Sequence, residues 1–239
     1  EMCIRDRPEA IRQVEARQYA IFPGEIRVYL CNSRQSFKAT TGREVAAMAY
    51  RGKIFLSPTL LASPDRLGHY LTHELSHLHL HQHVGGYGYL RIPAWFSEGL
   101  AAWVSDGGGA EKVTDEEVRD ALRRGNHFRP REKAGLGYRL VPIHASYWGI
   151  EHHFKHHLFY RQCMHFVTYL KREHPEGFRA FMGDLKKGTP FAKAFRAAFG
   201  TDTLTRWKVF KHQTIAAEPS AYAVRTQTHR RRPSKGRYL

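Results

Sequence analysis

The sequence predicts an α+β fold, with a small mixed sheet near the N-terminus and a helical C-terminal half. Residues 25–30 alternate apolar and polar side chains as a half-buried strand does, and the apolar segments 45–50 and 53–57 flank a turn as the strands of a hairpin do. Segments from residue 64 onward instead repeat apolar side chains every three or four positions, as amphipathic helices do. The length of 239 residues suits one domain with appendages.

One short helix and three strands are expected first. The helix would bury Ala10, Ile11 and Val14 on one face. Arg51-Gly52 is expected to be the turn of a hairpin, because two-residue hairpin turns favour glycine. The expected ranges are 8–20 for the helix, 25–30 for the first strand, and 45–50 and 53–57 for the hairpin strands.

The next helix carries the segment His73-Glu74-Leu75-Ser76-His77. Residues four apart lie on one helix face, so His73 and His77 can direct their imidazoles at one metal ion. Glu74 lies about 100° further round, where its carboxylate can reach a water molecule at that ion. Leucines at three- and four-residue spacing support the helix, with Ser63 as its N-cap and Gly85-Gly86 as its end. The alternative is a surface helix in a chain with 16 histidines.

A catalytic zinc ion commonly has three protein ligands, and two residues compete for the third place. His83 has the spacing of the H-E-x-x-H-x-x-G-x-x-H pattern, but that pattern needs a glycine where this chain has Leu80. A leucine continues the helix and carries His83 away. Glu98 lies in an apolar segment, residues 93–103, where a lone carboxylate is costly to bury unless it is paired or metal-bound. We expect Glu98 to be the ligand; a surface position or a pair with Arg91 is the alternative.

The motif, followed by Glu98 in a Trp-Phe-Ser-Glu-Gly-Leu-Ala context, resembles the gluzincin branch of zinc peptidases. It is most similar to the small bacterial peptidase-MA-like family. The resemblance covers about residues 25–212 and implies a zincin-like domain with the motif helix at its active site. Softer similarity extends to the flanking segments 26–30, 52–58, 160–170, 188–195 and 199–200.

The resemblance also implies roles for single residues. Zinc would be bound by His73, His77 and Glu98, and Glu74 would be the general base of a peptide-cleaving hydrolase. Tyr160 matches the start of the family's later helix and would hydrogen-bond the developing oxyanion, with Tyr147 in reserve. A tyrosine packed on its helix is the alternative. In zinc peptidases of this type an edge strand binds extended substrate, which implies that role for residues 53–57; an ordinary hairpin is the alternative.

The remaining segments are expected to be mostly helical. Thr114 with Glu117 three residues later predicts a capping box. Residues 125–145 look irregular and are expected to lie near the cleft. The expected helices are 115–124, 150–172, 176–186 and 189–198, and the last two carry an aromatic stripe of core residues: Phe178, Phe181, Phe191, Phe195 and Phe199.

The net charge of +16 favours an anionic partner. Part of it lies in residues 213–239, which are expected to be a disordered basic tail, either a nucleic-acid arm or merely solvated. The alternative function is therefore a basic nucleic-acid-binding protein with a structural or vestigial zinc site. Further histidines could store metal, but they lack a carboxylate at the motif's spacing: His79, His81, His83, His152, His153, His156 and His157.

Three domain ranges follow: 1–24 as an uncertain leader and short helix, 25–212 as the catalytic domain, and 213–239 as the tail. No apolar run is long enough for a transmembrane helix, and no signal peptide is visible. Residues 1–7 look like a stray translated leader, which leaves export and the compartment open. Three cysteines do not make a disulfide framework, although a single bridge between Cys31 and Cys163 stays open.

Overall fold

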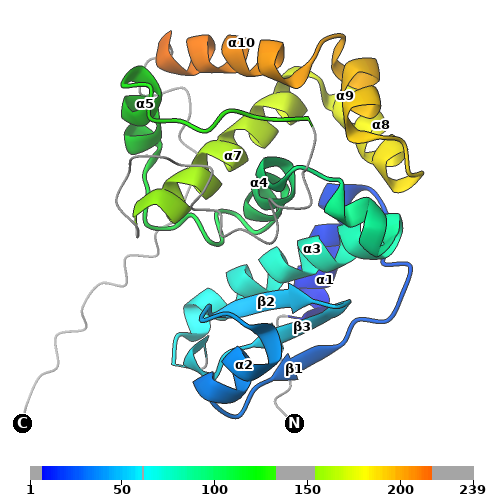
Figure 1. The fold of residues 1–239 in the computed structure, drawn as a ribbon, viewed down its shortest axis with the longest axis vertical. Helices are drawn as coiled ribbons and strands as arrows, with labels where there is room; N and C mark the ends of the chain where they lie inside the picture. Colours follow the sequence, from blue (N-terminus) through cyan, green and yellow to red (C-terminus); the bar gives the residue numbers. More distant parts are fainter. Residues whose placement is uncertain (1–6, 61, 133–153, 217–239) are drawn as a thin grey trace, which may run out of the picture.

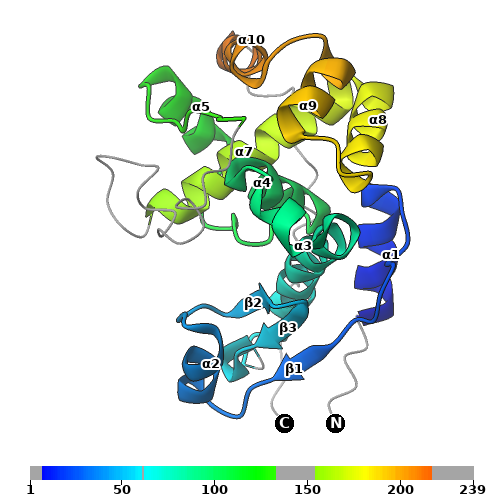
Figure 2. The same cartoon turned by 45° about the vertical axis from the view of Figure 1, so that its right-hand side comes forward.

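The computed structural model describes residues 7–60, 62–132 and 154–216. The fold is α+β, as predicted, with a three-stranded sheet at one end and a group of helices at the other (Figure 1). The long helix α3 (Pro64–Leu90) lies between these two parts. Helix α1 (Arg7–Gln18) packs along α3 and buries Ala10 and Val14, while Ile11 is half-buried against the core (Figure 2).

The sheet confirms the predicted hairpin. Strands β2 (Ala47–Tyr50) and β3 (Lys53–Leu56) pair antiparallel, and the turn residues Arg51 and Gly52 have φ of 49° and 73°. Positive φ at both central positions is the backbone of a type I′ turn. Strand β1 (Val28–Leu30) adds in parallel to the other side of β3.

The strand order β1-β3-β2 makes one prediction wrong. Residues 53–57 were expected to form an edge strand, but β3 is the central strand, and β1 and β2 are the edge strands. The hairpin pattern shows which two strands are neighbours. It does not show which of them a third, distant strand will join, because that choice depends on long-range pairing.

Two helices were not predicted. Helix α2 (Arg34–Thr41) has only eight residues and begins with a capping box between Ser33 and Ser36, in which a serine replaces the usual glutamate or glutamine. Helix α10 (Thr203–Ala216) continues into the segment expected to be a tail. A short 3-10 helix, η1 (Pro58–Leu60), links β3 to the segment before α3.

The C-terminal helices confirm the predicted pattern. The capping box of Thr114 and Glu117 starts α5, and all five phenylalanines of the aromatic stripe are buried. The ranges are α4 (Ala94–Val104), α5 (Asp115–Arg123), α7 (Phe154–Glu173), α8 (Pro175–Lys186) and α9 (Phe191–Phe199). Of the irregular segment 125–145, residues 125–132 form no helix or strand, and the remainder lies outside the described residues.

Helices α4 and α7 approach each other closely at Gly99. A β-carbon at Gly99 would lie 2.6 Å from the backbone oxygen of Cys163, so no larger residue fits without moving a helix. Cys163 is buried and Cys31 half-buried, and both are free thiols, so the bridge between them is not formed. Among the described helices, none combines the length and the hydropathy that a membrane span requires.

Candidate metal centre

Three side chains from two helices converge on one point. His73 and His77 project from α3 and Glu98 from α4, and their ligand atoms all lie within 4.8 Å of one another. The two Nε2 atoms are 3.1 Å apart, and Oε2 of Glu98 lies 3.4 Å from Nε2 of His73 and 3.3 Å from that of His77. Ligands about 2.05 Å from a tetrahedral ion would be about 3.3 Å apart. The group could therefore hold a metal ion.

The imidazole of His73 is oriented by the protein backbone. Its Nδ1 lies 2.9 Å from the carbonyl oxygen of Gly108, which can only accept a hydrogen bond. Nδ1 must therefore carry the hydrogen, and in the neutral ring Nε2 presents a lone pair to the cluster. The Gly108 contact is a ligand-orienting hydrogen bond of the kind that surrounds metal-binding histidines.

Tyr89 orients the other imidazole. Its phenol oxygen lies 2.9 Å from Nδ1 of His77, twelve residues away in the sequence. Gly85 makes this possible because its φ of 71° and ψ of 167° break the helix, and the chain then resumes a helical course that brings Tyr89 back over His77. Gly85-Gly86 was predicted to end the helix, and neither Tyr89 nor Gly108 was predicted to contact the site.

Glu98 presents a buried carboxylate oxygen to the two imidazoles. Its Oε2 is buried and has no hydrogen bond of normal geometry to any described residue. Burial opposes its ionisation, but the charges and close contact of His77 and His73 hold the pKa of this carboxyl well below its ordinary value. Burial likewise opposes protonation of His73, yet the contact with Glu98 and the charges of Glu74 and Glu98 raise its pKa. The lowered pKa of Glu98 and the raised pKa of His73 both mean that a positive charge is favoured between these side chains.

Glu74 lies beside the cluster and is buried. Its Oε2 accepts a hydrogen bond of 2.5 Å from the backbone N–H of Ala49 in β2. Because Ser57 N–H donates to Ala46 O in the β2–β3 ladder, residues 47 and 49 direct their own N–H and C=O groups away from β3. The predicted base is therefore held at the free edge of the sheet.

Tyr160, the predicted oxyanion-binding residue, lies against the cluster. Its ring stacks on that of His73, with centroids 5.6 Å apart and planes 19° from parallel. Burial, followed by the charge of Glu98, raises the pKa of this phenol well above its ordinary value, so the hydroxyl stays protonated and able to donate. Gly109, with φ of 82°, admits the ring, since a β-carbon there would lie 2.7 Å from it. The reserve candidate, Tyr147, lies outside the described residues.

None of the other histidines that the structure describes joins the cluster of His73, His77 and Glu98. Leu80 continues the helix as expected, and Nε2 of His83 is 3.1 Å from the carbonyl oxygen of Ile21 instead of the cluster. His79 is buried between Gln18 and the carbonyl of Ala20. In the described ranges, His73, His77 and Glu98 form the one group of three or more ligand side chains close enough to share a metal. His152 and His153 lie outside these ranges.

The comparisons with known proteins identify no relative. A scan against family models, a search of curated proteins and a search of solved structures each return no match.

Proposed function

We propose that this chain is a zinc-dependent peptidase that binds its metal through His73, His77 and Glu98. The observation that carries the proposal is the convergence of these three side chains around a buried carboxylate oxygen without a hydrogen bond, with Glu74 beside them. Two imidazoles and one carboxylate are a ligand set of catalytic zinc sites. A purely structural metal site would need no glutamate next to its ligands.

Each residue then has a chemical task. When bound, zinc supplies a Lewis acid that polarises a carbonyl and makes water nucleophilic near neutral pH. Glu74 accepts a proton from the attacking water and passes it to the leaving amine. Tyr160 donates a hydrogen bond to the oxygen that becomes negative as the carbonyl is attacked.

The free edge of β2 supports a peptide as the substrate. Residues 47 and 49 direct their backbone groups away from β3, and of these the Ala49 N–H is bonded to Glu74; an extended peptide can add to such an edge as a further strand. This assigns the substrate-binding role to β2, residues 47–50, in place of the segment 53–57.

The test compares two substitutions for zinc content and peptide hydrolysis. Glu74→Gln should bind one zinc per chain like the wild type but lose hydrolysis of a mixed peptide library by about a thousandfold or more, because the proton acceptor is gone. Glu98→Ala should lose zinc, because one of three ligands is missing. Undiminished turnover by Glu74→Gln, or full zinc occupancy of Glu98→Ala by elemental analysis, would contradict the assignment.

The net charge of +16 favours a second candidate function, binding of nucleic acid with a structural or vestigial zinc site. It predicts affinity for DNA or RNA that falls with salt, survives chelation of the metal, and is accompanied by no hydrolysis in the same peptide library. The placement of Glu74 favours the peptidase.

A further inference from the structure

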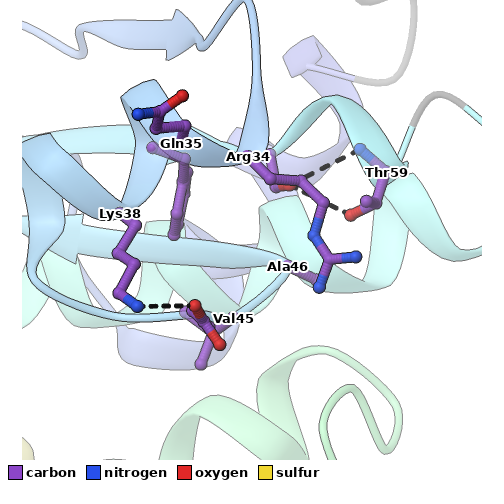
Figure 3. A pocket seen from close by; sticks show the side chains of 9 residues that line it. Arg34, Gln35, Lys38, Val45, Ala46 and Thr59 are labelled. Atoms are coloured by element: carbon purple, nitrogen blue, oxygen red, sulfur yellow. Dashed lines mark hydrogen bonds and ion pairs between the residues drawn. The ribbon is translucent and has the colours of Figure 1, made fainter.

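A pocket of about 480 Å³ lies between α2, the segment leading into β2 and the end of β3. Figure 3 shows the side chain of Arg34 extending from α2 across this pocket, with Lys38 on one side and Thr59 on the other. The buried ring of Phe37 and the side chains of Ala46 and Ser57 also line the pocket. None of these residues belongs to the metal centre.

The pocket has one cation in excess. Lys38 and Glu44 form an ion pair of 2.8 Å and offset each other, whereas Arg34 lies within 4.0 Å of no described carboxylate and acts on Glu44 only through its more distant charge. A guanidinium offers a fork of N–H donors that matches the two oxygens of a carboxylate. The hydroxyls of Ser57 and Thr59, 3.0 Å apart, add polar atoms to the same wall. The chemistry of the pocket therefore suits a carboxylate.

The pocket lies along strand β2 from the residue that contacts Glu74. Ala46 lines the pocket and lies three residues before Ala49, whose N–H is bonded to Glu74. Three residues of strand span about 10 Å. A peptide that pairs antiparallel with the free edge of β2 at Ala49 runs, from its N- to its C-terminus, toward Ala46. If the cleaved bond lies beside Glu74, and so opposite Ala49, the third residue on its C-terminal side lies beside Ala46 and reaches the pocket.

We propose that Arg34 binds a carboxylate of the substrate about three residues to the C-terminal side of the cleaved bond. This inference rests on the proposed peptidase function and deepens it. The carboxylate can be an acidic side chain at that position or the terminal carboxylate of a peptide that ends there. The two sources share one recognition chemistry and are separated by the choice of peptide.

The experiment uses the zinc-loaded full chain and matched peptides. One pair carries Glu or Gln at the third position beyond the cleaved bond, with an amidated end further along; a second pair ends at that position with a free or an amidated terminus. We expect the carboxylate-bearing member of at least one pair to have a kcat/KM about tenfold higher. In Arg34→Ala this ratio should fall to about one. Arg43→Ala, an exposed cation of the same region outside the pocket lining, should keep the wild-type ratio.

The experiment distinguishes failure of the carboxylate pocket from failure of the peptidase function. Hydrolysis with equal kcat/KM within both pairs, or a ratio that survives Arg34→Ala, would overturn the carboxylate pocket and leave the peptidase intact. A preference for Glu only on the N-terminal side of the cleaved bond would also overturn it. Zinc-loaded protein that cleaves no peptide at all would overturn the proposed function and this inference with it.

Discussion

At the candidate metal centre, the orientation of each imidazole is set by the residue that its Nδ1 atom contacts. Nδ1 of His73 is hydrogen-bonded to the carbonyl of Gly108, and Nδ1 of His77 to the hydroxyl of Tyr89. Both Nε2 atoms therefore face Glu98. Three electron-rich atoms at such short separations repel one another unless a cation or a proton lies between them. We therefore expect the contacts of Gly108 and Tyr89 to hold the candidate ligand atoms in position.

Replacing Tyr89 by Phe should weaken zinc binding by about 10–100-fold, because the hydrogen bond that holds the His77 ring is lost while the packing of the aromatic ring is kept. The measurement is a zinc dissociation constant from competition with a chelator. Tyr87→Phe is the matched control, since Tyr87 is 71% exposed and lies two residues away. Equal zinc affinity in wild type and Tyr89→Phe would show that Tyr89 does not position the ligand.

Pairs of elements set the distances within the site. The break at Gly85 in α3 places Tyr89, and the close approach of α4 and α7 at Gly99 places Glu98 on one side and Tyr160 on the other. Glu98 immediately precedes Gly99, so any widening between these helices would move a candidate metal ligand. We therefore expect changes at this contact to affect both stability and metal binding.

Gly99→Ala should destabilise the fold by about 1–3 kcal/mol, because the new β-carbon would meet the backbone oxygen of Cys163 at 2.6 Å and backbone cannot move aside cheaply. Gly183→Ala is the matched control. It lies inside α8 with nothing within 4 Å of the added carbon, so it should stabilise by about 0.5–1 kcal/mol through helix propensity. Urea unfolding of both variants measures the difference. A Gly99→Ala variant that is as stable as the wild type or more stable would be evidence against a tight α4–α7 contact.

Asp115, the first residue of α5, forms an ion pair and hydrogen bonds with side chains of α7. Its Oδ1 accepts hydrogen bonds from Arg161 at 2.6 and 2.9 Å and from His165 at 2.9 Å. Burial opposes its ionisation, but His165 and then Arg161 lower the pKa of this carboxyl from 3.8 to about 2. A depressed pKa stabilises the fold fully above the unfolded value and loses that contribution as the pH falls toward the folded one.

Asp115→Asn should therefore cost about 2 kcal/mol at pH 7, and the difference from wild type should shrink as the pH falls from about 4 toward about 2. Unfolding free energies across this range provide the measurement. Asp120→Asn, in the same helix, removes an exposed pair with Arg123 and should cost less than about 0.5 kcal/mol. A cost for Asp115→Asn that stays constant with pH would refute the linkage.

The whole molecule consists of a sheet end and a helical end that meet along α3 and α4 (Figure 1). The candidate metal ligands come from these two helices, and Glu74 connects them to the edge of the sheet. A metal ion that binds only the folded chain should consequently stabilise the protein as a whole.

Zinc at about 100 times its dissociation constant should add about 2.7 kcal/mol to the free energy of unfolding and raise Tm, and a chelator should reverse the shift. Glu98→Ala should show little of this effect because it lacks the ligand that joins α4 to α3. Thermal unfolding with and without zinc is the measurement. The same Tm under both conditions in the wild type would mean that the three side chains do not form a metal site.

Local physics let the amino-acid order alone predict much of this protein. The i, i+4 geometry of a helix places His73 and His77 together, Leu80 keeps His83 on the helix and away, and the cost of burying Glu98 identifies it as a partner. These inferences succeed because each depends on a few neighbouring residues or on burial.

Long-range packing settled the remainder. The order of strands, with β2 and not β3 at the edge, depends on where a distant strand pairs. The contacts of Tyr89, Gly108 and Arg34 depend on the Gly85 break, a glycine loop and an eight-residue helix that leave little periodic trace in the sequence. Hydrophobic periodicity records which face of an element is buried; it does not record which element will cover that face.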